Sequence, residues 1–182
     1  MSQTQLEFLL PRLYDVNATK PPQRTGQSRT PPRIPQAQGQ QAQKNGRWAE
    51  NDIASRLISH GYHQSTAPMG GLQPYFIREK KGLFTNVYGR PMRVDFYVWH
   101  PVKYPHGLVI ESKRQKRGGS VDEKYYFLIH NLQKLGLPVV LLLFGHGAKK
   151  GIIPWCLQQQ NDRLRIYTTW EAFTDDCNTG LL

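Results

Sequence analysis

Two apolar segments of the sequence carry charged residues where burial is expected. Asp95 interrupts the apolar and aromatic run of residues 93–99, while Glu111 and Lys113 interrupt the run of residues 108–115. A buried carboxylate is costly unless a cation or hydrogen bonds compensate its charge. Two carboxylates on adjacent strands would offer oxygen ligands to a hard divalent cation such as Mg²⁺. Such a metal would polarise a phosphodiester and lower the pKa of an attacking water, which Lys113 would orient.

Alternation along a strand sets the side chains of Glu111, Lys113 and Gln115 on one face. On that face Gln115 would hold a water or the scissile phosphate, or else it is ordinary polarity at a strand edge. Lys113 would alternatively neutralise charge that builds on the phosphate. The competing interpretation of Asp95, Glu111 and Lys113 is a salt-bridge cluster that serves only structure.

The acid-x-Lys spacing occurs twice more in the sequence, so its context must identify the site. Residues 79–81 read Glu-Lys-Lys and lead straight into Gly82, which predicts a turn. Residues 122–124 read Asp-Glu-Lys and open a predicted helix, where acids stabilise the positive end of the helix dipole. Residues 111–113 alone end an apolar strand that follows a strand with an isolated acid, which favours the catalytic interpretation.

Hydrophobic periodicity and turn residues predict the elements that position this site. Residues 48–60 form a predicted helix that ends at Gly61, and its apolar side chains at helical spacing are Ala49, Ile53, Ala54, Leu57 and Ile58. Further predicted elements are strands at 75–78, 84–88, 92–99 and 108–115, a helix at 121–135 with a capping box of Ser120 and Glu123, a buried strand at 138–144, a helix near 151–159, a strand at 163–167 and a short helix from Trp170. The order α-β-β-β-β-α-β-α-β-α predicts an α/β fold, a mixed sheet flanked by helices.

The pattern Val94-Asp95, a spacer of 15 residues and then Glu111-Ser112-Lys113 resembles the PD-(D/E)XK nuclease superfamily. The resemblance covers roughly residues 46–173, and residues 119–124 and 138–147 look like those of small restriction-type and homing-type members common in cyanobacteria and their phages. It implies a restriction-endonuclease-like fold, with Asp95 and Glu111 as ligands of Mg²⁺, for which Mn²⁺ would substitute, and Lys113 as the catalytic cation. Val94 stands where the family name has Pro, a position that serves backbone geometry.

The family often draws another metal-binding acid from its first helix, where Glu50 and Asp52 compete for the role. Helical geometry puts Glu50 on the stripe of Ile53, Ala54 and Leu57, which faces the sheet. Asp52 lies instead on the solvent side. We therefore expect Glu50 to assist at the metal, the alternative being a first-turn acid that stabilises the helix dipole.

The chain carries 24 Lys and Arg against 13 Asp and Glu, a net charge of +11, which indicates a polyanionic partner. We expect DNA phosphates to contact the cations around the turn after the motif, namely Lys113, Arg114, Lys116, Arg117 and Lys124. A second basic segment is predicted to grip the duplex from a hairpin, through Arg78, Lys80 and Lys81. Either group is alternatively a solvated charged surface. The histidines are scattered, and Cys156 and Cys177 predict neither a disulfide framework nor a zinc module.

Three regions are predicted along the chain: a short peptide (1–16), a linker (17–45) and a nuclease domain (46–182). The linker holds five prolines, seven glutamines, five cations and no acid, a composition typical of a disordered basic tail. Gln3, Leu6 and Phe8 resemble the peptide by which bacterial DNA-processing proteins bind the sliding clamp, although a helix packed on the domain's own surface explains them better. The sequence shows no membrane span or signal peptide, so a cytoplasmic location is expected.

These features together predict a Mg²⁺-dependent endodeoxyribonuclease of restriction or homing type that acts on double-stranded DNA. Cutting both strands would favour a homodimer or tetramer, since protein symmetry matches paired half-sites. The alternatives are a junction-resolving or transposon-end nicking nuclease, a catalytically silent DNA-binding module of the same fold, and an RNA-directed nuclease. Carboxylates at positions 95 and 111 argue against the silent module, because they would repel phosphates unless a metal intervenes.

Overall fold

The computed structural model describes residues 37–114, 123–145 and 150–182, which belong to one compact unit. Its strands are β1 (His63–Ser65), β2 (Tyr75–Thr85), β3 (Pro91–His100), β4 (Tyr104–Arg114), β5 (Val139–Phe144) and β6 (Leu164–Tyr167). Its helices are α1 (Ala37–Ser59), α2 (Glu123–Lys134), α3 (Ile152–Gln158) and α4 (Trp170–Asp176), followed by the closing turn η2 (Cys177–Leu181). None of the helices in the described part is long and apolar enough to span a membrane.

The six strands form one mixed sheet in the order β1-β2-β3-β4-β5-β6. β3 runs antiparallel to both β2 and β4, whereas the pairs β1–β2, β4–β5 and β5–β6 are parallel. The parallel pair β4–β5 is connected through α2, as a parallel connection requires. The predicted α/β fold with a mixed sheet is confirmed.

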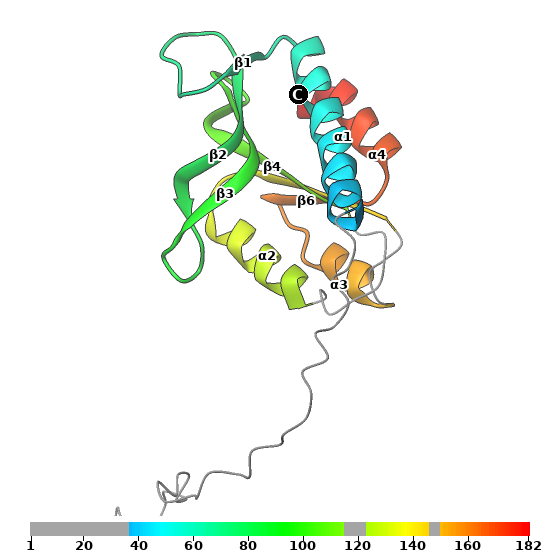
Figure 1. Ribbon diagram of the computed structural model, residues 1–182. Helices are drawn as coiled ribbons and strands as arrows, with labels where there is room; N and C mark the ends of the chain where they lie inside the picture. Colours follow the sequence, from blue (N-terminus) through cyan, green and yellow to red (C-terminus); the bar gives the residue numbers. More distant parts are fainter. Residues whose placement is uncertain (1–36, 115–122, 146–149) are drawn as a thin grey trace, which may run out of the picture. The chain divides into compact units, whose positions relative to one another are not determined.

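Helices cover both faces of this sheet (Figure 1). On one face α1, α4 and η2 pack in a core cluster that includes Ile53, Phe96 and Phe173. On the other face α2 and α3 pack in a second cluster that includes Ile129 and Leu141. β5 is buried along nearly its whole length, because it lies between two neighbouring strands with helices on both faces.

The first helix begins earlier than the sequence predicted, at Ala37 rather than at residue 48. The last part of the predicted linker, residues 37–45, is therefore helical, while the rest of that linker and the peptide 1–16 lie outside the described residues. The linker prolines end at Pro35, and the Gln, Ala and Lys that follow are good helix formers. Averaging composition over the whole segment hid this boundary. Of the predicted apolar stripe, Ile58 is exposed and the other members are buried.

The predicted strands at 75–78 and 84–88 are wrong as separate elements, because β2 runs continuously from Tyr75 to Thr85. Residues 79–81 consequently lie in a strand and do not form the predicted turn. A bulge between Lys81 and Phe84 contains Gly82 at φ 75°. The glycine that suggested a turn therefore forms a bulge, and the pairing with β3 continues beyond it. Beyond Ile77, β3 is the one described strand that pairs with β2, and such edge segments tolerate charged side chains.

The turn after β2 docks on α2, which fixes the hairpin against the rest of the domain. Val87 N–H donates to Asn131 Oδ1 at 2.8 Å, and Lys134 Nζ donates to the carbonyl of Asn86 at 2.7 Å. The ring of Tyr88 stacks on that of Phe127, with centroids 5.5 Å apart. The short polar strand β1 was not predicted, since its residues carry no apolar alternation. Ser120 of the predicted capping box lies outside the described residues.

Candidate active site

The site lies where β3 and β4 separate. Their antiparallel register runs as far as the pair Phe96 and Ile110, and one further step sets Asp95 opposite Glu111. Between these two residues a hydrogen bond to a side chain takes the place of the bond between backbone groups: Asp95 N–H donates to Glu111 Oε2 at 3.0 Å. In return Ser112 donates to Asp95 Oδ2 through its N–H at 2.9 Å and through its hydroxyl at 3.1 Å. Each carboxylate is thus held by the backbone of the opposite strand.

β3 twists sharply at Asp95. Val94 packs in the core cluster with α2 and α3, whereas Phe96 packs in the cluster with α1 and α4. Two residues apart on a regular strand would share one face, so the strand rotates between them. The opposing position on β2 is irregular as well, since Glu79 has φ 50°, a conformation uncommon for a residue with a side chain. The carboxylate of Asp95 reaches Ser112 on β4, one residue beyond Glu111, at the point where β3 and β4 separate, which is called the β3–β4 fork below.

Asp95 and Glu111 are both buried, with 8% and 5% of their surfaces exposed. Burial, and next to it the charge of Asp95, raises the pKa of Glu111, although Lys113 opposes that shift. Burial alone would lower the pKa of Lys113, but the carboxylates of Glu111 and Asp95 outweigh it and raise that pKa. The ammonium therefore stays protonated beside two carboxylates that repel each other.

Lys113 lies on the same side of β4 as Glu111, as alternation predicted. Its Nζ is 2.5 Å from Glu111 Oε1, and 43% of its side chain is exposed. The residue therefore links the buried carboxylate to the solvent. An ammonium in this position can hold a proton and donate a hydrogen bond to a group that approaches from outside.

Glu50 lies on α1, close enough to Asp95 for the two carboxylates to repel each other. Burial, followed by the charges of Asp95 and Glu79, raises the pKa of Glu50, while Arg78 and Arg93 oppose the shift. Its Oε2 lies 3.7 Å from Arg78 Nη2. The competing acid Asp52 pairs instead with Arg56, one helical turn away, at 3.4 Å. On α1, the charge of Asp95 acts on Glu50.

The donor set fits a hard divalent cation. In the described part of the chain, no three His, Cys, Asp or Glu side chains form a metal cage, and no donor reaches Asp95 Oδ1. Mg²⁺, however, commonly uses only one or two carboxylates and keeps its remaining positions for water and substrate phosphate. Two buried carboxylates whose mutual repulsion raises the pKa of one of them are groups that such a cation would stabilise. The residues present thus suit magnesium, with Asp95 and Glu111 in the central role.

A family model described as a PD-(D/E)XK nuclease superfamily domain matches residues 41–174. The chain belongs to the PD-(D/E)XK nuclease superfamily. Comparisons with curated proteins and with solved structures give no match. The matched range contains both strands of the fork and α1 from residue 41 onward, so the acids compared above all lie inside the superfamily domain. Membership in this superfamily indicates a nuclease and, in general, a metal-dependent phosphodiesterase.

The structure describes only part of the predicted DNA contact. Arg114 is exposed at the end of β4, with its guanidinium 5.9 Å from the ring centre of Trp48, and Lys124 is exposed on α2. Lys80 and Lys81 lie on the edge segment of β2. Gln115, Lys116 and Arg117 lie outside the described residues, so their roles stay predictions.

Arg78 has a second possible role that the sequence did not suggest. Its Nη2 donates to Asn51 Oδ1 at 2.9 Å, in addition to its ion pair with Glu50. The guanidinium also lies over the ring of Phe96, 5.7 Å from its centre. With these three contacts Arg78 holds Glu50 in place, and a DNA phosphate would have to compete for it.

Sequence reasoning missed Ser112, Arg93 and Glu79. Ser112 was treated only as the variable position of the motif, yet it holds Asp95. Arg93 lies two residues before Asp95 on the same strand, so its nearness to the site could have been inferred from that spacing. The place of Glu79 opposite Asp95 follows from the β2–β3 register, which no local sequence pattern reveals.

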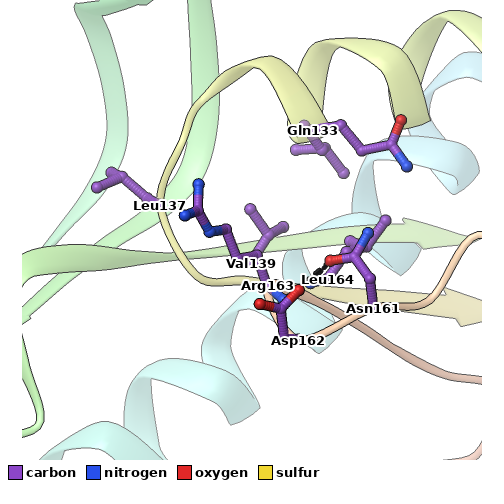
Figure 2. A pocket seen from close by; sticks show the side chains of 8 residues that line it. Gln133, Leu137, Val139, Asn161, Asp162, Arg163 and Leu164 are labelled. Atoms are coloured by element: carbon purple, nitrogen blue, oxygen red, sulfur yellow. Dashed lines mark hydrogen bonds between the residues drawn. The ribbon is translucent and has the colours of Figure 1, made fainter.

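A pocket of about 330 Å³ lies away from this site, at the first residues of β5 and β6 (Figure 2). Val139 and Leu164 pair there, whereas Glu111 and Lys113 pair farther along β5. Asn161 Oδ1 accepts the N–H groups of Arg163 and Leu164, so its polar group is used within the loop itself. The pocket contains none of the residues of the fork and is not a candidate for the chemistry.

Proposed function

We propose that this protein is a Mg²⁺-dependent endodeoxyribonuclease that hydrolyses phosphodiester bonds in double-stranded DNA. The observation that carries the proposal is the buried pair Asp95 and Glu111 beside the partly exposed Lys113. Two carboxylates that repel each other in a buried position cost free energy, which a simple structural ion pair would avoid. A divalent cation bound between the two carboxylates would offset this repulsion.

Asp95 and Glu111 would hold the cation, and Glu50 would assist them from α1. When bound, the cation supplies polarisation of the phosphodiester and a lower pKa for a water molecule. Ser112 keeps Asp95 oriented through two hydrogen bonds. Lys113 keeps its proton at Nζ and would donate to the attacking water or to the phosphate, where negative charge develops.

Charge supports DNA as the substrate. The residues from 46 onward carry 18 cations and 11 acids, a net charge of +7, so the domain itself is basic. Arg114, Lys80, Lys81 and Lys124 are available for phosphate contacts, which bind without reading sequence. Lys116 and Arg117 complete the predicted contact surface.

Within the nuclease class we propose a restriction or homing role. One chain would provide one active site and cut one strand, so cleavage of both strands would use a homodimer or tetramer. Light scattering after gel filtration, with and without duplex DNA, measures that state. A monomer that only nicks would favour the junction-resolving or transposon-end nicking alternative.

Plasmid cleavage tests the proposal directly. Supercoiled plasmid is incubated with the protein in Mg²⁺, in Mn²⁺ or in EDTA, alongside Glu111→Ala and Lys113→Ala, with circular dichroism as the check on folding. We expect metal-dependent cutting that falls by a factor of about 10² or more in each variant. Unchanged cutting by both variants would refute the site. Failure of the wild-type protein to cut any duplex or branched substrate would favour the silent DNA-binding module.

The N-terminal peptide gives a separate proposal, that Gln3, Leu6 and Phe8 bind a bacterial sliding clamp. A labelled peptide of residues 1–16 would show this by fluorescence polarisation, with Leu6→Ala plus Phe8→Ala as its matched control. Equal polarisation of both peptides would reject it.

A further inference from the structure

Arg93 is a cation beside the candidate site that neither the motif nor the predicted DNA contacts include. It lies on β3 two residues before Asp95, and its Cα partner on β2 is Lys81. It lies close enough to Lys113 on β4 for the two positive charges to repel each other. With 48% of its side chain exposed, it stands at the open end of the fork, where a DNA strand would enter.

The contact that holds Arg93 is an exposed ion pair. Arg93 Nη1 lies 3.4 Å from Glu79 Oε2, and 56% of the Glu79 side chain is exposed. Pairs this exposed contribute little to stability, so the fold gains little from this one. Glu79 is also the only non-glycine residue in the described ranges with a positive φ. Such backbone conformations persist where the surroundings enforce them, and they concentrate at functional sites.

The charge of Arg93 acts on two other groups of the candidate site. It opposes the raised pKa of Glu50 on α1 and, in the same way, the raised pKa of Lys113 on β4. Among the described residues the guanidinium of Arg93, unlike that of Arg78, makes no contact with an aromatic ring and has Glu79 as its single ion-pair or hydrogen-bond partner. It is therefore accessible to an anion, and its planar set of donors suits a phosphate.

We propose that Arg93 binds a backbone phosphate of the DNA strand in the active site, and that Glu79 holds the guanidinium until that phosphate displaces it. The inference rests on the proposed function, because DNA must be the ligand of the fork. Two consequences follow that have opposite signs. Removing Arg93 weakens DNA binding, whereas removing the charge of Glu79 strengthens binding, provided that Arg93 is present.

Fluorescence anisotropy with a labelled duplex tests both consequences in full-length protein. Ca²⁺, a larger cation with the same preference for oxygen ligands, replaces Mg²⁺, and gels check that the duplex stays intact. Arg93→Gln should weaken binding by a factor of about 10 and reduce the slope of log K against log[salt] by about one. The control Arg163→Gln removes an equal charge at the amino end of β6 and should change the slope much less.

The acid is tested against a matched charge change. Glu79→Gln should tighten binding by a factor of about 3 to 10, more than Asp175→Asn, which removes an exposed acid on α4. In the Arg93→Gln background the advantage of Glu79→Gln over Asp175→Asn should vanish, because the two residues act through one contact.

The outcomes separate this inference from the proposed function. An unchanged salt slope in Arg93→Gln, or a Glu79→Gln effect that persists without Arg93, would overturn the inference while cleavage by the wild-type protein stands. A reduced slope together with no cleavage in Mg²⁺ would support Arg93 and reject the nuclease. A wild-type protein that binds no duplex would reject both.

Discussion

The backbone N–H of Asp95 donates to the carboxylate of Glu111, 3.0 Å away on the neighbouring strand. The carboxylate of Asp95 accepts in turn from Ser112, the residue after Glu111. These bonds take over where the ladder between β3 and β4 ends. The two acids of the motif are thus both the candidate ligands of a cation and the groups that satisfy the backbone where the sheet opens.

This arrangement predicts a pH dependence of stability in the metal-free protein. Burial and the charge of Asp95 raise the pKa of Glu111 above its ordinary value of 4.5, so the folded protein holds this proton more tightly than the unfolded chain. The contribution of Glu111 to stability therefore falls as pH rises from about 4.5 through the raised pKa, and is constant above it. Urea unfolding in EDTA, compared between wild type and Glu111→Gln, should show the variant gaining relative stability over that range.

The control for this comparison is Glu171→Gln, which changes an exposed acid on α4 and should leave the pH profile unchanged. Adding Mg²⁺ should stabilise the wild type more at high pH than at low pH, because the cation needs the ionised carboxylate. A wild-type protein that gains stability over Glu111→Gln as pH rises in EDTA would contradict the assignment of the raised pKa.

The two acids of α1 should differ in their effect on cleavage. Glu50 lies in the field of Asp95, and substitution of such a supporting acid commonly costs a factor of about 10 to 100. We expect that loss for Glu50→Gln in single-turnover cleavage, with a higher Mg²⁺ requirement. Asp52→Asn breaks only a pair with Arg56 and should stay within a factor of about 2. A larger loss in Asp52→Asn would reverse the choice between them.

Gly107 should be intolerant of a side chain. It has φ 104°, and a Cβ there would overlap Cε2 of Tyr97 on the neighbouring strand. Gly107→Ala should therefore lower the free energy of unfolding by about 1–3 kcal/mol. Gly70→Ala, which meets nothing within 4 Å, should change it by less than about 0.5 kcal/mol. Equal chemical denaturation midpoints for the two variants would show that Tyr97 moves aside without cost.

Asn131 should secure the β2–β3 turn on α2. Its side chain is buried and accepts the N–H of Val87. Asn131→Ala should cost about 1–2 kcal/mol and speed hydrogen exchange at the Val87 amide. Gln133→Ala, on the exposed side of the same helix, serves as the comparison. Unchanged exchange at Val87 in Asn131→Ala would mean that the ring contact of Tyr88 with Phe127 holds the turn without it.

The sequence predicted those elements whose burial shows in the local pattern of apolar residues. β5 is a continuous apolar run, and the isolated acids of β3 and β4 stand out against apolar neighbours. β2 was divided in two because its charged middle lies on a sheet edge, where neighbouring strands and not composition decide the conformation. The start of α1 was placed too late because nearby prolines dominated the composition.

Part of the geometry of the candidate site was predictable from the sequence, and part was not. Alternation placed Lys113 beside Glu111, and helical facing chose Glu50 over Asp52. The hydrogen bonds of Ser112 to Asp95 arise because the strands separate there, and the pairing of Arg93 with Glu79 arises from register across β2 and β3. Both depend on contacts between segments distant in sequence.

Asp95 and Glu111 are candidate metal ligands and also accept hydrogen bonds from the backbone. These two roles decide which substitutions suit a trapped complex with substrate. An alanine at position 111 removes a ligand and also leaves the amide of Asp95 without its acceptor, a loss of about 1–3 kcal/mol for a buried donor. Glutamine keeps an oxygen for that amide, and asparagine at position 95 keeps one for Ser112. Crystals of uncut DNA with this protein are therefore best sought with Glu111→Gln and Asp95→Asn. These substitutions should abolish cleavage and keep the hydrogen bonds that join β3 and β4 at the site.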